Sequence, residues 1–99
     1  MNTFYSSERG IQILIRLLKD FGIKKIVTSP GATNMMLNAS LMYDGSFEMI
    51  SSVDERSAAY MACGMAAESG EAVALSCTGA TASRNYYPGL TEAFYRKLP

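Results

Sequence analysis

The chain has 99 residues, in which nine Lys and Arg residues balance nine Asp and Glu residues and histidine is absent. This length allows one domain at most, and the zero net charge argues against a protein that binds nucleic acid or an anionic membrane. Without histidine, these residues form no Ser-His-Asp triad and no histidine-ligated zinc site. Two cysteines without a CxxC spacing, and no apolar stretch of membrane-spanning length, favour a cytoplasmic protein.

The first half of the chain is predicted to alternate helix and strand. Residues 7–21 have apolar side chains at positions i, i+3, i+4 and i+7, which is typical of an amphipathic helix. Residues 25–29 are predicted to form a short strand that ends at a Pro-Gly turn. A second helix follows to about residue 42, with Thr33 or Asn34 as its cap, and residues 47–53 are the second predicted strand.

The second half continues the alternation. Residues 54–70 are predicted to form a helix with a face of small side chains, which allows close packing. These small residues are Ala58, Ala59, Ala62, Cys63 and Ala66. Residues 72–78 form a continuous apolar run, typical of a strand buried on both faces. The last predicted helix, residues 81–97, should be kinked or broken at Pro88-Gly89.

Helices that alternate with strands predict right-handed βαβ units and a parallel sheet, hence a Rossmann-like, three-layer α/β/α fold. Three strands make a small sheet, and the last helix is followed by Leu98-Pro99, where another strand would normally begin. We therefore expect residues 1–99 to form one domain that is the first part of a larger one. A complete three-stranded domain is the alternative.

Ligands of open parallel sheets bind beyond the carboxyl ends of the strands, so three loops are candidates for a site. In the first loop, Pro30 and Gly31 would let the backbone approach an anion at the start of the next helix. The sequence there matches neither GxGxxG nor GxxxxGK[ST], so the residues by themselves favour an ordinary strand-to-helix turn.

The second and third loops contain residues that could take part in binding or proton transfer. Glu55 would complement the helix dipole at the start of its helix, or would exchange a proton with a ring nitrogen of a ligand. Residues 78–83 are small or hydroxyl-bearing, which suits either a helix start or a ligand that needs space. Arg84 and Asn85 follow within one turn.

Taken together, these segments resemble the N-terminal, pyrimidine-binding domain of thiamine diphosphate-dependent enzymes. The resemblance covers residues 7–99 and rests on the order and spacing of several motifs. These are Ser29-Pro30-Gly31, Asp54-Glu55-Arg56 before an Ala-rich helix with Gly64, the apolar strand ending at Thr78, and Asn85-Tyr86-Tyr87-Pro88-Gly89. The third loop has Gly79 and Ala80 where the family commonly has Ser and Gly.

The resemblance implies a catalytic role for Glu55. In the family, the matching Glu hydrogen-bonds a ring nitrogen of the cofactor's aminopyrimidine and thereby activates thiamine diphosphate for attack on a 2-oxo acid. The cofactor-binding residues implied are Pro30, Gly31, Thr78, Gly79, Ala80, Thr81 and Asn85.

The same resemblance implies partners. Family members hold the diphosphate and Mg²⁺ through a Gly-Asp-Gly…Asn motif in another domain, of the same or a partner chain, and they form homo-oligomers. The 99 residues contain no such motif, so the chain by itself is expected to be inactive and to provide no metal ligand.

Two other functions fit the sequence. The Ala-rich helices could make a dimerisation module without enzymatic activity, which would ignore thiamine diphosphate. A small flavodoxin-like domain could instead bind a phosphorylated metabolite at the Pro30-Gly31 loop, with no role for Glu55.

Overall fold

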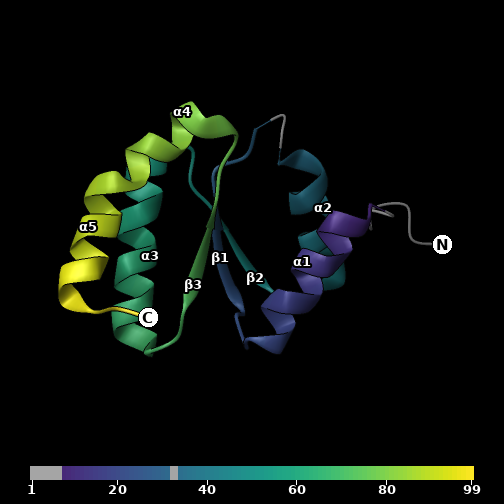
Figure 1. Ribbon diagram of the computed structural model, residues 1–99, viewed down its shortest axis with the longest axis horizontal. Helices are drawn as coiled ribbons and strands as arrows, with labels where there is room; N and C mark the ends of the chain where they lie inside the picture. Colours follow the sequence, from purple (N-terminus) through teal and green to yellow (C-terminus); the bar gives the residue numbers. More distant parts are fainter. Residues whose placement is uncertain (1–7, 32–33) are drawn as a thin grey trace.

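A computed structural model of the protein describes residues 8–31 and 34–99 (Figure 1). Its first elements are α1 (Arg9–Asp20), β1 (Lys25–Thr28), α2 (Met35–Asp44), β2 (Glu48–Ser51), α3 (Glu55–Ser69) and β3 (Val73–Ser76). They are followed by α4 (Gly79–Ser83), the 3₁₀ turn η1 (Arg84–Tyr86) and α5 (Tyr87–Arg96). The predicted alternation of helices and strands is confirmed.

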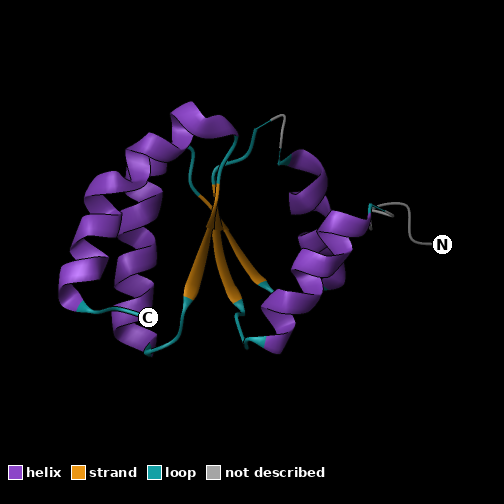
Figure 2. Ribbon diagram, viewed as in Figure 1, coloured by secondary structure: helices purple, strands orange, loops and turns teal. Residues whose placement is uncertain are grey.

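The three strands form one parallel sheet in the order β2-β1-β3. In the register of this sheet, Thr28 at the end of β1 lies opposite Ser51 of β2 and Ser76 of β3. Helices α1 and α2 cover one face of the sheet, and α3 and α5 cover the other (Figures 1 and 2). The predicted three-layer α/β/α fold is therefore confirmed.

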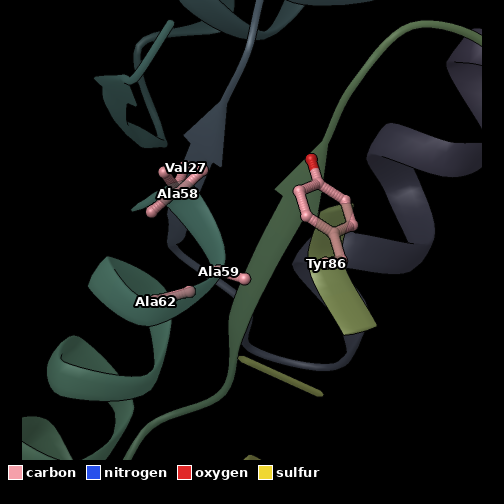
Figure 3. Close-up of a cluster of buried hydrophobic side chains, with 5 residues drawn as sticks. All are labelled: Val27, Ala58, Ala59, Ala62 and Tyr86. Atoms are coloured by element: carbon pink, nitrogen blue, oxygen red, sulfur yellow. The ribbon is translucent and has the colours of Figure 1, made fainter. Parts of the chain in front are cut away.

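Two apolar clusters hold the layers together, and the central strand contributes to both. Neighbouring side chains of a strand point to opposite faces, so Ile26 packs against α1 and α2 while Val27 packs against α3. The first cluster contains Ile15, Ile26, Leu41 and Phe47, and the second contains Val27, Ala58, Ala59, Ala62 and Tyr86 (Figure 3). Burying a side chain such as Ile26 stabilises the fold by about 1.5–3 kcal/mol.

Helix α3 packs closely against α5 because the contact is made by small residues. The buried face of α3 consists of the five small residues expected from the sequence, Ala58, Ala59, Ala62, Cys63 and Ala66. Gly89 of α5 lies directly against Ala59, where an added Cβ would be 2.5 Å from the Ala59 Cβ. The Cys63 thiol donates a hydrogen bond to the Gly89 carbonyl oxygen at 3.2 Å.

Two expectations are corrected. Strand β3 is half-buried along its whole length rather than buried on both faces, because among the described residues it pairs only with β1. The last helix is broken at η1, before the Pro-Gly pair, and Pro88 lies in the first turn of α5. The proline is accommodated there because backbone N–H groups of a first turn have no partner within the helix.

The ends of α1 and α2 are joined by an ion pair that predicts a pH-dependent stability. The Lys19 Nζ donates to the Asp44 Oδ2 at 2.8 Å, and the Asp44 side chain is only 8% exposed. The Lys19 ammonium, helped by the Ser46 N–H, lowers the pKa of Asp44 below its usual value. The unfolded-state pKa is about 3.9, so the pair stabilises the fold above that value and is lost as pH falls through the lower folded-state pKa.

We therefore expect Asp44→Asn to lower the thermal midpoint at pH 7 and to approach the wild-type midpoint as the pH falls toward 2. Calorimetry between pH 7 and pH 2 measures this convergence. Asp20→Asn is the matched control, because Asp20 forms an exposed pair with Arg16 within α1 and should change the midpoint less. A gap between Asp44→Asn and wild type that stays constant with pH would contradict the assignment.

Candidate functional site

The three candidate loops leave the sheet at the same edge, the one formed by the carboxyl ends of the strands. The strand hydrogen bonds continue past the strand ends, from the Ser29 N–H to the Ser76 carbonyl at 2.8 Å and from the Ser52 N–H to the Thr28 carbonyl at 2.9 Å. The residues after β1, β2 and β3 are thus held side by side at the upper edge in Figure 1. This edge is where open parallel sheets bind their ligands.

Asn34 ties the first loop to the third strand. Its Oδ1 accepts a hydrogen bond from the Gly31 N–H at 2.8 Å. Its Nδ2 donates to the Ser29 carbonyl at 3.3 Å and to the Ser76 Oγ at 3.1 Å, and the residue is 5% exposed. Asn34, one of the two expected caps, occupies the N-cap position of α2, whereas Thr33, the other, lies outside the described residues. The Asn34 side chain caps no helical N–H and instead holds the loop.

The first and third loops touch at Gly31 and Thr78. A Cβ at Gly31 would lie 2.4 Å from Cγ2 and 2.5 Å from Cβ of Thr78, closer than real Cβ atoms approach. Glycine is therefore required at position 31 by the neighbouring loop. This contact brings together two of the residues that the sequence assigned to cofactor binding.

Gly31→Ala is expected to push the two loops apart and to cost about 1–3 kcal/mol of unfolding free energy, as overpacking does. Thr78→Gly in the same chain removes both atoms that clash and should restore most of the loss. Chemical denaturation of the two single variants and the double variant measures the coupling. Additive effects in this cycle would show that the residues do not press on one another.

Glu55 stands at the start of α3, directly after its N-cap. The Asp54 carboxylate accepts hydrogen bonds from the Ser57 N–H at 3.0 Å and the Ser57 Oγ at 2.7 Å, so Asp54 caps the helix. Glu55 is half-buried, and within the described residues its carboxylate makes no hydrogen bond or ion pair. A carboxylate placed in this way is free to accept or share a proton with a ligand.

The edge of the sheet carries two separate hollows. One, of about 630 Å³, lies at the end of β3 and is lined by Asn34, Ser76, Cys77, Gly79, Ser83 and Tyr86, among others. A second, of about 640 Å³, lies between α2 and the ends of β1 and β2, with Pro30, Gly31, Met35, Asn38 and Met42 in its lining. Glu55 lines neither of them.

The remaining predicted residues belong to the third loop and the short helix that follows it. Gly79, Ala80 and Thr81 form the first turn of α4. Asn85 is exposed, and its Nδ2 donates to the Ala82 carbonyl of the same turn at 3.3 Å. Their roles in binding a cofactor stay predictions.

Tyr86 lines the hollow at the end of β3, and the sequence analysis gave this residue no role of its own. It is 7% exposed, and its hydroxyl has no hydrogen-bond partner among the described residues. The sequence does contain a hint, because a tyrosine that packs against the Ala-rich helix must also bury its hydroxyl, and a buried hydroxyl needs a polar partner.

The same region holds two polar groups that lack a hydrogen-bond partner among the described residues, the half-buried Glu55 carboxylate and the buried Tyr86 hydroxyl. The described residues contain no cluster of three or more Cys, Asp or Glu side chains that could hold a metal ion. Among the same residues, no helix is long and apolar enough to cross a membrane.

Comparison with known proteins gives the class. The family described as "Thiamine pyrophosphate enzyme, N-terminal TPP binding domain" matches residues 8–99. The chain belongs to this family, which confirms the resemblance seen in the sequence.

Individual relatives share one description. The chain is 46% identical over 99 residues, its whole length, to 2-succinyl-5-enolpyruvyl-6-hydroxy-3-cyclohexene-1-carboxylate synthase of Porphyromonas gingivalis, of which it covers 17%. It is 38% identical over 95 residues, 96% of its length, to the synthase of the same name from Bacteroides thetaiotaomicron, again covering 17% of the relative. The chain thus spans about a sixth of the length of these relatives.

Proposed function

We propose that this chain is the cofactor-binding, N-terminal segment of a thiamine diphosphate-dependent enzyme that decarboxylates or condenses a 2-oxo acid. The observation that carries the proposal is the position of Glu55. Its unpaired carboxylate follows β2 at the edge where Gly31 and Thr78 meet, in a chain of the thiamine pyrophosphate enzyme family.

Glu55 would hold a ring nitrogen of the aminopyrimidine through a shared proton. The start of α3 favours a negatively charged side chain at this position. The residues Pro30, Gly31, Thr78, Gly79, Ala80, Thr81 and Asn85 would surround the heterocycle. When bound, thiamine diphosphate supplies the electron sink that decarboxylation of a 2-oxo acid requires.

Residues 1–99 would then be one part of a pyrimidine-binding domain. The free edge of β3 among the described residues and the sixfold greater length of the relatives support this proposal. The diphosphate and Mg²⁺ would be bound by a second domain of the same or a partner chain, in a cytoplasmic homo-oligomer.

Calorimetric titration of the complete protein with thiamine diphosphate and Mg²⁺ tests the proposal. We expect saturable binding, and weaker binding of an analogue in which carbon replaces the ring nitrogen facing Glu55. Equal affinity for the two compounds would remove the role of Glu55, and failure to bind either would remove the proposed function.

The names of the relatives extend the proposal to a product. We propose that the complete enzyme forms 2-succinyl-5-enolpyruvyl-6-hydroxy-3-cyclohexene-1-carboxylate, as the names of its relatives state for them. Mass spectrometry of the reaction mixture identifies this product directly. Turnover of simple 2-oxo acids without this product would leave the cofactor role intact and remove the substrate assignment.

A further inference from the structure

Tyr86 is held rigidly at the edge where the three loops meet. Its ring belongs to the apolar cluster between α3 and the sheet, beside Ala58, Ala59 and Val27. Figure 3 shows the hydroxyl oxygen beside the end of β3. The packing therefore fixes the ring and aims its polar end at the edge of the sheet.

The hydroxyl at this position has no partner of its own. Tyr86 is 7% exposed, and no described group accepts or donates a hydrogen bond to its oxygen with acceptable geometry. Leaving a buried hydroxyl unpaired costs free energy, so such a group calls for an explanation. The neighbouring Cys77 offers only a thiol, which is a weak hydrogen-bond group.

The same surroundings keep the hydroxyl protonated. Burial raises the pKa of Tyr86 above its usual value, and the Cys77 thiol and the negative charge of Glu55 act in the same direction. Tyr86 thus carries an O–H donor throughout the physiological pH range.

The hydroxyl belongs to a residue that lines a hollow large enough for a ligand. Tyr86 lines the space of about 630 Å³ at the end of β3, together with Asn34, Ser76 and Gly79. The Asn34 Nδ2 already donates to the Ser76 Oγ, whereas the buried Tyr86 hydroxyl has no hydrogen-bond partner among the described residues.

From this arrangement we propose that Tyr86 is a ligand-binding residue whose hydroxyl donates a hydrogen bond to an acceptor atom of bound thiamine diphosphate. The proposal rests on the proposed function and adds to it a donor on η1, separate from Glu55 on α3. Within the part of the chain that the structure describes, this donor has no partner before the ligand arrives. Its removal should therefore weaken binding without weakening the fold.

Tyr86→Phe in the complete protein tests this, because it removes only the hydroxyl. We expect its Kd for thiamine diphosphate, measured by calorimetric titration with Mg²⁺, to rise about 3- to 10-fold, as loss of one hydrogen bond does. The thermal midpoint without cofactor should stay the same or rise, because an unpaired buried group has been removed. Tyr87→Phe is the matched control, since Tyr87 is 71% exposed and should change neither quantity.

The results separate this inference from the proposed function. An unchanged Kd in Tyr86→Phe, while the wild type binds thiamine diphosphate, overturns the inference and leaves the proposed function in place. A lower cofactor-free midpoint also overturns it, because the hydroxyl would then have a partner in the folded protein. A wild type that does not bind the cofactor removes both.

Discussion

Glu55→Gln in the complete enzyme is expected to lower turnover by about 10²- to 10⁴-fold, the range typical of losing a proton-transferring group. Glutamine keeps the shape of the side chain and a hydrogen-bonding end, but it cannot take up or release the proton shared with the cofactor ring. The carboxylate makes no hydrogen bond or ion pair with other described residues, so the fold should tolerate the change. Steady-state kinetics and a thermal melt of the same preparation measure the two effects.

Glu68→Gln is the matched control for this experiment. Glu68 lies in the same helix, α3, and is exposed at the end away from the site. Glu68→Gln changes the net charge by the same amount as Glu55→Gln and should leave turnover unchanged. Undiminished turnover in Glu55→Gln, or an equal loss in both variants, would contradict a direct role for Glu55.

Gly89→Ala is expected to lower the free energy of unfolding by about 3 kcal/mol, the upper end of the range for overpacking. The added Cβ would lie 2.5 Å from the Ala59 Cβ and 3.1 Å from the Ala59 carbonyl carbon. The backbone of Ala59 cannot rotate out of the way, so α5 must move away from α3. That movement would also disturb the hydrogen bond from Cys63 to the Gly89 carbonyl.

Gly64→Ala is expected to have the opposite effect on the free energy of unfolding, although it lies in the same region. Gly64 lies inside α3, and an added Cβ there would meet nothing within 4 Å. Alanine is the better helix former, so this variant should gain about 0.5–1 kcal/mol. Urea denaturation of both variants measures the contrast, and a loss in Gly64→Ala similar to that in Gly89→Ala would show that the helix contact is not the cause.

Local patterns predicted the fold well because each element has a clear signal of its own. The small face of α3 and the turn signals between the strands were readable residue by residue. The sequence predicted a break in the last helix at Pro88-Gly89, whereas the structure has it earlier, at η1. A proline is accepted in a first helical turn, and the reason for Gly89 is a contact with Ala59, thirty residues earlier in the chain.

The candidate site was predictable only in part, for a similar reason. The position of Glu55 at the end of a strand follows from the alternation of elements. The hydrogen bond from Asn34 to Ser76 depends on which strands are neighbours in the sheet, and so does the lack of a described partner for the Tyr86 hydroxyl. The sequence of one chain contains no local signal for that order. Asn34 was therefore expected only as a helix cap and Tyr86 only as part of a motif, and their hydrogen-bonding states are seen in the structure.

The unpaired side of β3 has a practical consequence for work with this segment by itself. Among residues 8–31 and 34–99, β3 pairs only with β1, so its other side offers a row of backbone groups without a strand partner. The apolar side chains of Val73, Ala74 and Leu75 flank this half-buried strand. Such an edge is a template on which strands of other molecules add, so concentrated preparations of the 99-residue chain should aggregate. A lysine placed on this strand should improve the solubility of the isolated chain more than the same change on α1.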